Sequence, residues 1–375
     1  MRAFISIAAL AALIPALAAP TGNVPITKFP GQVKANSYII KLKDGVNKDS
    51  HLNSIISSFV AGSSLQYKYG DVFHGYAVTL RGKDLDFIRQ SKDIEFIEED
   101  GVVSIEYFPG DESAVPPAAP LVGRATGGEG VDIYGIDTGI YTAHSQFGGR
   151  AKWGATYGGY ANQDGNGHGT HTAGTAVGST YGQASSANII AVKVLSDSGS
   201  GAYSDVISGV NYAYNQFKTT GRPSIATMSL GGSGYIPLDD AVYAAISGGL
   251  HFTIAAGNSN VDASSTSPAR VSTANTVGAV DSSNRKASFS NYGPIVDIQA
   301  PGVNILSAWI GSTTATNTIS GTSMATPFVA GILAYAISEY GNKSPADLTA
   351  DLKSYGRPVI TGEPSGTTNL LATKW

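Results

Sequence analysis

One short segment, Gly321 to Pro327 (GTSMATP), most constrains the fold, because it places a serine on a glycine turn that leads directly into an apolar helical pattern. Pro327 suits a first helical turn, where a missing N–H costs nothing. Ser323 is then expected at a helix N-terminus, where N–H groups and the helix dipole favour the negative charge that develops when a hydroxyl attacks a carbonyl. A serine that only caps the helix is the alternative. The residues at the spacing of a buried helix face are Val329, Ile332, Leu333 and Ala336.

A second segment, Asp164 to Gly174 (DGNGHGTHTAG), carries two histidines among residues with very small side chains. A serine hydroxyl is a poor nucleophile unless a neighbouring base takes its proton, and the pKa of histidine suits that role at neutral pH. His168 and His171 are three residues apart and would share one helix face, so a metal site is the alternative. It is disfavoured, because no Glu follows the first His and the chain has no Cys.

Two predicted apolar strands end in polar side chains. Val131 to Ile140 (VDIYGIDTGI) brings Asp137 to the end of a strand, and Phe252 to Asn258 (FTIAAGN) ends in a side-chain amide. Strand ends in α/β sheets hold functional groups. The aspartate can fix the tautomer of a catalytic imidazole, and Asn258 can donate a hydrogen bond to an oxyanion.

An aspartic protease is a competing interpretation, since Asp137 begins an Asp-Thr-Gly tripeptide and Asp197 begins Asp-Ser-Gly. Such an enzyme needs two equivalent lobes with an apolar strand before each carboxylate. Asp197 instead lies in the polar run Ser196 to Ser200. This interpretation is therefore disfavoured.

The chain order Asp137, His168, Asn258, Ser323, with the motifs around each residue, resembles that of the subtilisin-type serine proteases. Tyr141 to Arg150 (YTAHSQFGGR) and Ala287 to Gly293 (ASFSNYG) resemble the fungal proteinase K-like branch. The resemblance covers the chain from about Val131 to its end. It implies an α/β fold with a mainly parallel central sheet between helices. It also implies acyl transfer in which Ser323 attacks, His168 carries the proton, Asp137 orients His168, and Asn258 with the Ser323 N–H stabilises the oxyanion.

A smaller unit precedes these motifs. Tyr38 to Leu42, Val72 to Leu80 and Ile94 to Ile97 are predicted as strands. The helices between them carry apolar positions at Leu52, Ile55, Ile56 and Phe59, and at Leu85 and Ile88. The pattern suggests a ferredoxin-like β-α-β-β-α-β domain. Within the resemblance this is the inhibitory prosegment, residues 20–115 with a folded part at about 36–107, which acts as an intramolecular inhibitor; the catalytic domain is 116–375.

The beginning of the chain indicates secretion. Met1-Arg2 supplies a small basic region, Ile5 to Leu17 an apolar core, and Ala16-Leu17-Ala18 a cleavage site, so residues 1–19 are predicted as a signal peptide. Without cysteine, no disulfide stabilises the product. Charged residues are 14% of the 375, and the net charge of −4 comes with no basic stretch, which disfavours nucleic acid as a partner. We expect an extracellular monomer with no membrane association.

Glycine-rich segments predict how peptide or protein substrates bind. Ser198, Gly199, Ser200 and Gly201 resemble one backbone edge that pairs with an extended peptide in this family, and Ser229, Leu230 and Gly231 resemble the other. Main-chain pairing is nearly blind to sequence. Ala255, Ala256 and Gly257 are expected to line a roomy pocket. The prediction is a broad endopeptidase that prefers large apolar or aromatic residues before the cut bond.

No cofactor is required for this chemistry, but the resemblance implies a structural calcium on the Asp297 carboxylate and the carbonyls of Ser272 and Ala274. Asn342 begins a glycosylation sequon, Asn-Lys-Ser, that Pro345 follows. Pro109 to Gly130 is predicted to be an exposed linker suited to cleavage.

The chain departs from the family at two points. Relatives usually carry a Trp-Gly-Leu segment before the Asp strand, where this chain has only Ala118 to Gly130, and they have His where Phe328 stands. The shortened segment leaves open a second function, that of a peptide-binding protein that kept the cleft and lost turnover.

Overall fold

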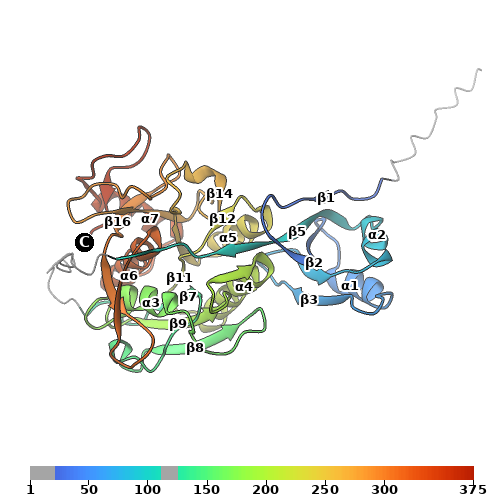
Figure 1. Ribbon diagram of the computed structural model, residues 1–375, viewed down its shortest axis with the longest axis horizontal. Helices are drawn as coiled ribbons and strands as arrows, with labels where there is room; N and C mark the ends of the chain where they lie inside the picture. Colours follow the sequence, from blue (N-terminus) through green and yellow to red (C-terminus); the bar gives the residue numbers. More distant parts are fainter. Residues whose placement is uncertain (1–21, 111–125) are drawn as a thin grey trace, which may run out of the picture.

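The computed structural model describes residues 22–110 and 126–375, so the predicted signal peptide and most of the predicted linker lie outside it. A small N-terminal unit lies beside a larger one, and a long strand runs from the first across the second (Figure 1). Within the described residues no helix is both long enough and apolar enough to cross a membrane.

The small unit is the predicted α+β domain. Its sheet has the order β1-β5-β2-β4-β3, in which β2 is antiparallel to both β4 and β5. Ile40, Leu52 and Ile88 come from a strand and the two helices and are buried in one core. The elements are β1 (Ile26–Thr27), β2 (Val33–Leu42), α1 (Lys48–Ile56), β3 (Ser64–Lys68), β4 (Gly75–Thr79), α2 (Lys83–Arg89) and β5 (Ile94–Ser104).

Several details of this unit differ from the prediction. The folded part begins with β1, about ten residues earlier than expected, and β3 went unpredicted because it is an edge strand without fully buried residues. The strand predicted from Val72 begins only at Gly75. Val72 does not pair with a neighbouring strand, because its side chain packs into the core of the large unit. Helix α1 ends at Ile56, which is 40% exposed, so Phe59 lies beyond the helix.

The large unit contains a nine-stranded sheet in the order β19-β20-β16-β15-β13-β11-β7-β9-β8. All neighbouring strands are parallel except β19 and β20. The predicted α/β fold with a mainly parallel central sheet is confirmed. The strands are β7 (Asp132–Asp137), β8 (Ala151–Thr156), β9 (Asn188–Lys193), β11 (Ser224–Met228), β13 (His251–Ala255), β15 (Asn275–Val280), β16 (Ile298–Pro301), β19 (Arg357–Pro358) and β20 (Leu370–Leu371).

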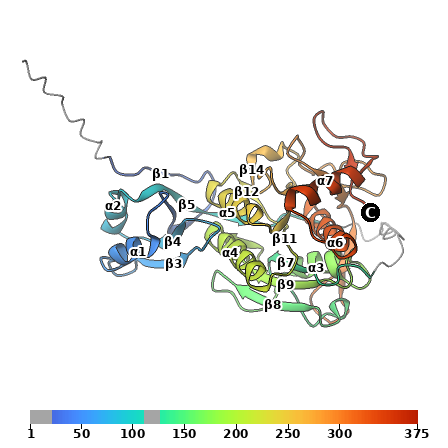
Figure 2. The same ribbon diagram turned by 180° about the vertical axis from the view of Figure 1, so that it is seen from behind.

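Helices cover both faces of this sheet, as the alternation of side chains along each strand requires. In β7, Ile133 packs in the cluster formed with α3 and α6, whereas its neighbour Tyr134 packs in the cluster formed with α4 and α5. Helix α7 lies at the end of the molecule far from the small unit (Figure 2). The helices are α3 (His168–Val177), α4 (Tyr203–Thr220), α5 (Ile236–Ser247), α6 (Thr322–Tyr340) and α7 (Pro345–Tyr355).

Helix α6 begins earlier than predicted. It starts at Thr322, so Pro327 lies inside the helix and not in its first turn. Proline has no N–H to give to the carbonyl four residues earlier, which is that of Ser323. The Ser229 hydroxyl donates to this carbonyl instead, at 2.8 Å. The expected buried face of α6, including Val329 and Leu333, is confirmed.

The connections of the sheet reverse direction at β7, which lies between β9 and β11. Ligand sites in open α/β sheets form at the carboxyl ends of strands beside such a switch point. Asp137 is the last residue of β7. A ligand site is therefore expected at this end of the sheet.

Candidate active site

Asp137 and His168 form a buried pair at this end of the sheet. His168 is the first residue of α3, and its Nδ1 lies 2.8 and 2.9 Å from the two carboxylate oxygens of Asp137. Gly167 precedes it with φ +102°, a backbone conformation that suits glycine. The other ring nitrogen, Nε2, is buried and has no hydrogen-bond partner among the described residues. The imidazole is held on one side and free to accept a proton on the other.

A carboxylate that the sequence analysis did not single out connects the two loops. Asp164 Oδ1 accepts hydrogen bonds from the Thr138 hydroxyl at 2.9 Å and from Gly167 N at 2.8 Å. Its other oxygen accepts from the Thr170 hydroxyl at 2.6 Å. Asp164 therefore holds the Asp137 turn against the start of α3. An aspartate before a run of glycines is a common turn residue, so nothing in its position distinguished it.

His171 does not join His168 in a metal site. Its Nε2–H donates to the backbone carbonyls of Ile305 at 3.0 Å and Asn317 at 3.2 Å. Burial lowers the pKa of His171 to about 3, so the ring is neutral at physiological pH. Among the described residues no three His, Cys, Asp or Glu side chains come close enough to hold a metal ion.

Ser323 lies in the first turn of α6 and is 2% exposed. Its hydroxyl donates to the carbonyl of Ser229 at 3.3 Å, a long hydrogen bond, while the Ser229 hydroxyl donates to the Ser323 carbonyl. The weak contact leaves the Ser323 hydroxyl able to rotate. Phe328, on the same helix, is buried in the core cluster shared with α3.

The Asn258 side chain is oriented by its own hydrogen bonds. Its Oδ1 accepts from Thr322 N at 2.8 Å and from the Thr322 hydroxyl at 2.9 Å, which turns Nδ2 toward the cleft. Nδ2 donates to the carbonyl oxygen of Glu106 at 2.6 Å. Glu106 follows β5, the last strand of the small unit. The chain itself therefore places a peptide carbonyl on the predicted oxyanion donor.

The residues before Glu106 lie between the two predicted backbone edges. Strand β10 (Ser200–Ala202) pairs antiparallel with β5, with Ser200 opposite Ser104 and Gly201 opposite Val103. The carbonyl of Gly199 accepts from Ile105 N at 2.9 Å, and Gly231 on the other edge forms a bridge with Ser104. Ser198 lies beside Glu106 at the rim of this groove. The small unit thus occupies the groove in the manner predicted for an extended peptide.

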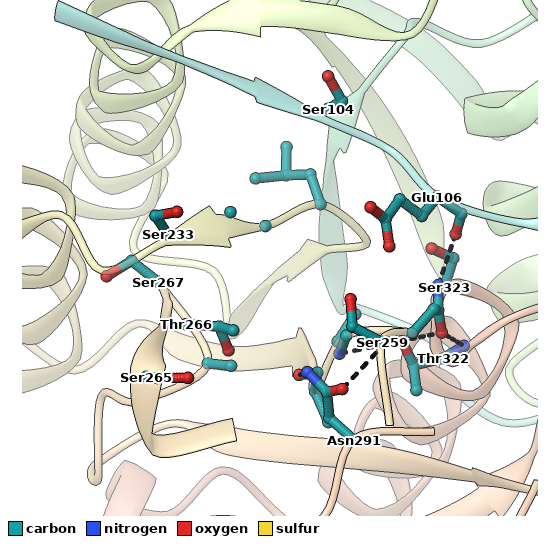
Figure 3. Close-up of a pocket in the computed structure, with 18 of the residues that line it drawn as sticks. Ser104, Glu106, Ser233, Ser259, Ser265, Thr266, Ser267, Asn291, Thr322 and Ser323 are labelled. Carbon is teal, nitrogen blue, oxygen red and sulfur yellow. Dashed lines mark hydrogen bonds between the residues drawn. The ribbon is translucent and has the colours of Figure 1, made fainter. Parts of the chain in front are cut away.

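A cavity of about 550 Å³ opens below this segment. Figure 3 shows Glu106 and Ser323 at one end of it and Ser233 and Ser267 at the other. The Glu106 side chain lines the cavity and remains exposed, and it is the only charged side chain among the lining residues. The predicted substrate-binding residues that line it are Ser229, Leu230, Gly231, Ala255, Ala256 and Gly257.

The chain continues past Glu106 along a third edge, which the sequence analysis missed. The Tyr107 ring lies 5.5 Å from the ring of His168. Strand β6 (Phe108–Pro109) then pairs antiparallel with β18 (Thr316–Ser320), and the Phe108 ring lies 5.0 Å from that of Phe289. The Glu106–Tyr107 peptide bond therefore crosses the cleft beside His168 and Ser323, with the backbone held on both sides.

Carboxylates of the small unit are buried against the large one. The side chain of Asp100 accepts from Ser204 N at 2.9 Å and from the Ser204 hydroxyl at 2.7 Å, and so caps helix α4, whose own N-cap residue Ala202 has no side-chain acceptor. The hydroxyl of Tyr235 donates to the carbonyl of Glu99 at 2.9 Å. The interface therefore supplies the start of α4 with a cap that the large unit lacks.

The burial of Glu98 predicts that the association of the two units depends on pH. It is 5% exposed, and burial raises its pKa to about 7, with Arg270 opposing the shift and Asp239 and Asp240 adding to it. One Asp239 oxygen is buried without a partner among the described residues. Separation of the small unit from the large one would return Glu98 to its ordinary pKa near 4.5, so the bound state takes up a proton. This contribution to binding is complete below about pH 4.5 and is lost as pH rises through about 7.

We expect the small unit, once the chain between the two units is cut, to bind the large unit up to about tenfold more weakly for each pH unit between 5 and 7. The fraction that co-elutes with the large unit immediately after cleavage measures this. Glu98→Gln should flatten the dependence, whereas Glu95→Gln on the same strand, whose carboxylate is 45% exposed, should leave it intact. Binding that strengthens between pH 5 and 7 would contradict the assignment.

The predicted calcium residues fit a metal poorly. The Asp297 carboxylate accepts from Thr276 N at 2.9 Å through Oδ2 and pairs with Lys353 Nζ at 2.5 Å through Oδ1. Ser272 and Ala274 lie in a turn closed by the hydrogen bond from Ala274 N to the Val271 carbonyl. Calcium prefers six to eight oxygen ligands, and here both oxygens of the only carboxylate are already engaged.

The structure also shows the surroundings of Asp197, from the aspartic-protease alternative, and of Asn342, the predicted glycosylation site. Asp197 pairs with Lys193 Nζ at 2.8 Å, and the Lys193 hydrogen bond lowers its pKa, whereas Asp137 pairs with His168. The two aspartates therefore belong to separate pairs and not to a carboxylate dyad. Asn342 is exposed, and its Oδ1 accepts from His251 Nε2 at 2.9 Å.

Comparisons with known proteins agree with this geometry. A family model described as the subtilase family matches residues 128–355, and one described as peptidase inhibitor I9 matches residues 37–106. The chain is 42% identical to Subtilisin-like protease 2 of Pseudogymnoascus destructans, covering 98% of this chain and 97% of that protein. It is 39% identical to the Cuticle-degrading protease of Metarhizium anisopliae, covering 98% of each. A solved cold-adapted subtilisin-like serine proteinase matches with a TM-score of 0.62 and 47% identity, over 66% of this chain and 89% of that one.

Proposed function

Because the chain belongs to the subtilase family of serine peptidases and carries an I9-type inhibitor domain, we propose that it is a secreted endopeptidase that cuts its own Glu106–Tyr107 bond. The observation that carries the proposal is the hydrogen bond from Asn258 Nδ2 to the Glu106 carbonyl oxygen. That contact puts a peptide carbonyl where an oxyanion would be stabilised. The backbone pairing on both sides of the bond supports the same assignment.

In the proposed mechanism the Ser323 hydroxyl rotates away from the Ser229 carbonyl and attacks the carbonyl carbon of Glu106. His168 Nε2 takes the hydroxyl proton, and Asp137 stabilises the imidazolium through Nδ1. The proton then passes to the nitrogen of Tyr107 as the peptide bond breaks, which leaves Glu106 as an ester on Ser323. Water, deprotonated by His168, hydrolyses that ester and restores the hydroxyl.

Broad specificity with a preference for large apolar or aromatic residues is also part of the proposal. The cavity walls contributed by Ala255, Ala256 and Gly257 are small and uncharged, which supports an apolar side chain before the cut bond. Among the lining residues that the structure describes, none offers a cation to the exposed Glu106 carboxylate. We therefore infer that the prosegment ends in a residue that suits the cavity poorly. This poor fit weakens binding of the cleaved prosegment and so favours its release.

The extracellular setting is proposed from the N-terminal pattern alone, and the glycosylation site from the sequon at Asn342. The exposure of Asn342 supports glycan attachment at Nδ2, which the hydrogen bond from His251 to Oδ1 leaves open. We propose that the mature enzyme acts as a monomer on protein and peptide substrates.

The test is the intact mass of the full-length chain, followed over time for wild type and Ser323→Ala. Wild type should split so that the larger product begins at Tyr107, while Ser323→Ala stays whole. Ser264→Ala, at an exposed serine, should split like wild type. Cleavage at another bond would overturn the Glu106–Tyr107 assignment and leave the peptidase in place. If wild type stays whole, the peptide-binding alternative gains support.

A further inference from the structure

Helix α7 contacts the central sheet region through the charged side chain of Lys353 and through Thr349, whose hydroxyl donates to Asn275 Oδ1 at 2.9 Å. Its N-terminus is capped by Ser344, whose hydroxyl accepts from Asp347 N at 3.2 Å. Lys353, near its other end, reaches Asp297 immediately before β16. The remaining contacts between α7 and the sheet region include buried Leu348 and Leu352.

The carboxylate that Lys353 reaches is poorly solvated. The Asp297 side chain is 12% exposed, whereas that of Lys353 is 43% exposed. A buried carboxylate that loses its partner is strongly destabilising. This corner of the fold therefore requires a cation beside Asp297.

We propose that the ammonium of Lys353 permanently supplies this cation, in the position where the family resemblance implies a calcium ion. Lys353 Nζ lies 2.5 Å from one Asp297 oxygen, and Thr276 N occupies the other. A divalent ion at Asp297 would have to displace the ammonium. The corner formed by Asp297 and α7 is then stable without calcium, and this conclusion does not depend on the catalytic proposal.

Thermal unfolding of the full-length chain tests this, in a Ser323→Ala background that prevents self-digestion. The measured quantity is the midpoint of the large unit in EDTA and in excess CaCl₂. The difference between the two midpoints should be the same with and without Asp297→Asn. If calcium stabilises the chain more when Asp297 is intact, the ion binds there and the proposal is wrong.

A second set of variants tests the ammonium itself. Lys353→Met keeps the apolar stem and should lower the midpoint in EDTA by roughly 3–6 °C, with partial recovery in CaCl₂ as the vacated carboxylate takes up the ion. Lys353→Arg should behave like the parent chain. The control is Lys343→Met, which removes a pair with Asp351 at the surface of the same region. A Lys353→Met midpoint equal to that of the control, or no recovery with calcium, would overturn the proposal.

Discussion

Replacing His168 with alanine is expected to slow self-cleavage of the full-length chain by about a million-fold, so that no product forms over days. The magnitude is that of subtilisin itself, a relative of this chain, and is carried over from it. The physical reason is that the Ser323 hydroxyl stays protonated without a base, and the buried Nε2 of His168 has no other hydrogen-bond partner among the described residues. The first-order loss of full-length mass is the measurement.

Two comparisons make the His168 result specific. The double variant His168→Ala with Ser323→Ala should be no slower than either single variant, because the two groups act in one proton transfer. The unfolding midpoint of each variant shows whether the fold survives. A loss of less than about a hundred-fold from His168→Ala, with the fold intact, would mean that another group accepts the proton.

Asp137→Asn is expected to slow the same reaction by about ten thousand-fold. Thr138 N donates to Asp137 Oδ1 at 2.6 Å, and an asparagine would keep its oxygen on this donor. Its NH₂ group would then face His168 Nδ1, which must become an acceptor, so Nε2 would carry the hydrogen and could no longer take the serine proton. The geometry would persist with the wrong tautomer.

The matched control is Asp197→Asn, in the second Asp-X-Gly tripeptide of the chain. Asp197 is half exposed, and the buried Lys193 ammonium with which it pairs keeps its hydrogen bond to the Thr138 carbonyl, so loss of the Asp197 charge should reduce cleavage by less than about tenfold. Equal losses from the two substitutions would instead indicate a carboxylate pair and revive the aspartic interpretation. The same mass measurement distinguishes the two outcomes.

For some elements the local sequence pattern alone is enough to predict the structure. The apolar run of β7 and the spacing of Val329 and Leu333 in α6 specify buried elements through periodicity alone. Glycines before His168 and Ser323 mark turns that must approach other backbone closely. The fold class was therefore predictable, because parallel strands buried on both faces read as continuous apolar segments.

Other features depended on partners far away in the chain. The position of Pro327 inside α6 is tolerated because the Ser229 hydroxyl satisfies the carbonyl that proline leaves free. Edge strand β3 has no buried stripe to reveal it. Asp164 looks like any turn residue until its two oxygens are seen to join the Asp137 turn to α3.

The sequence by itself determined the peptidase family, the two-unit organisation and four polar side chains of the site, namely Asp137, His168, Asn258 and Ser323. Each of these can be recognised from short, contiguous motifs. Only the tertiary structure decided which bond lies on Asn258, that Glu98 is buried against the carboxylates of α5, and that Lys353 neutralises Asp297. Those features are distances and desolvation between segments up to 152 residues apart, and a one-dimensional pattern carries no information on either quantity.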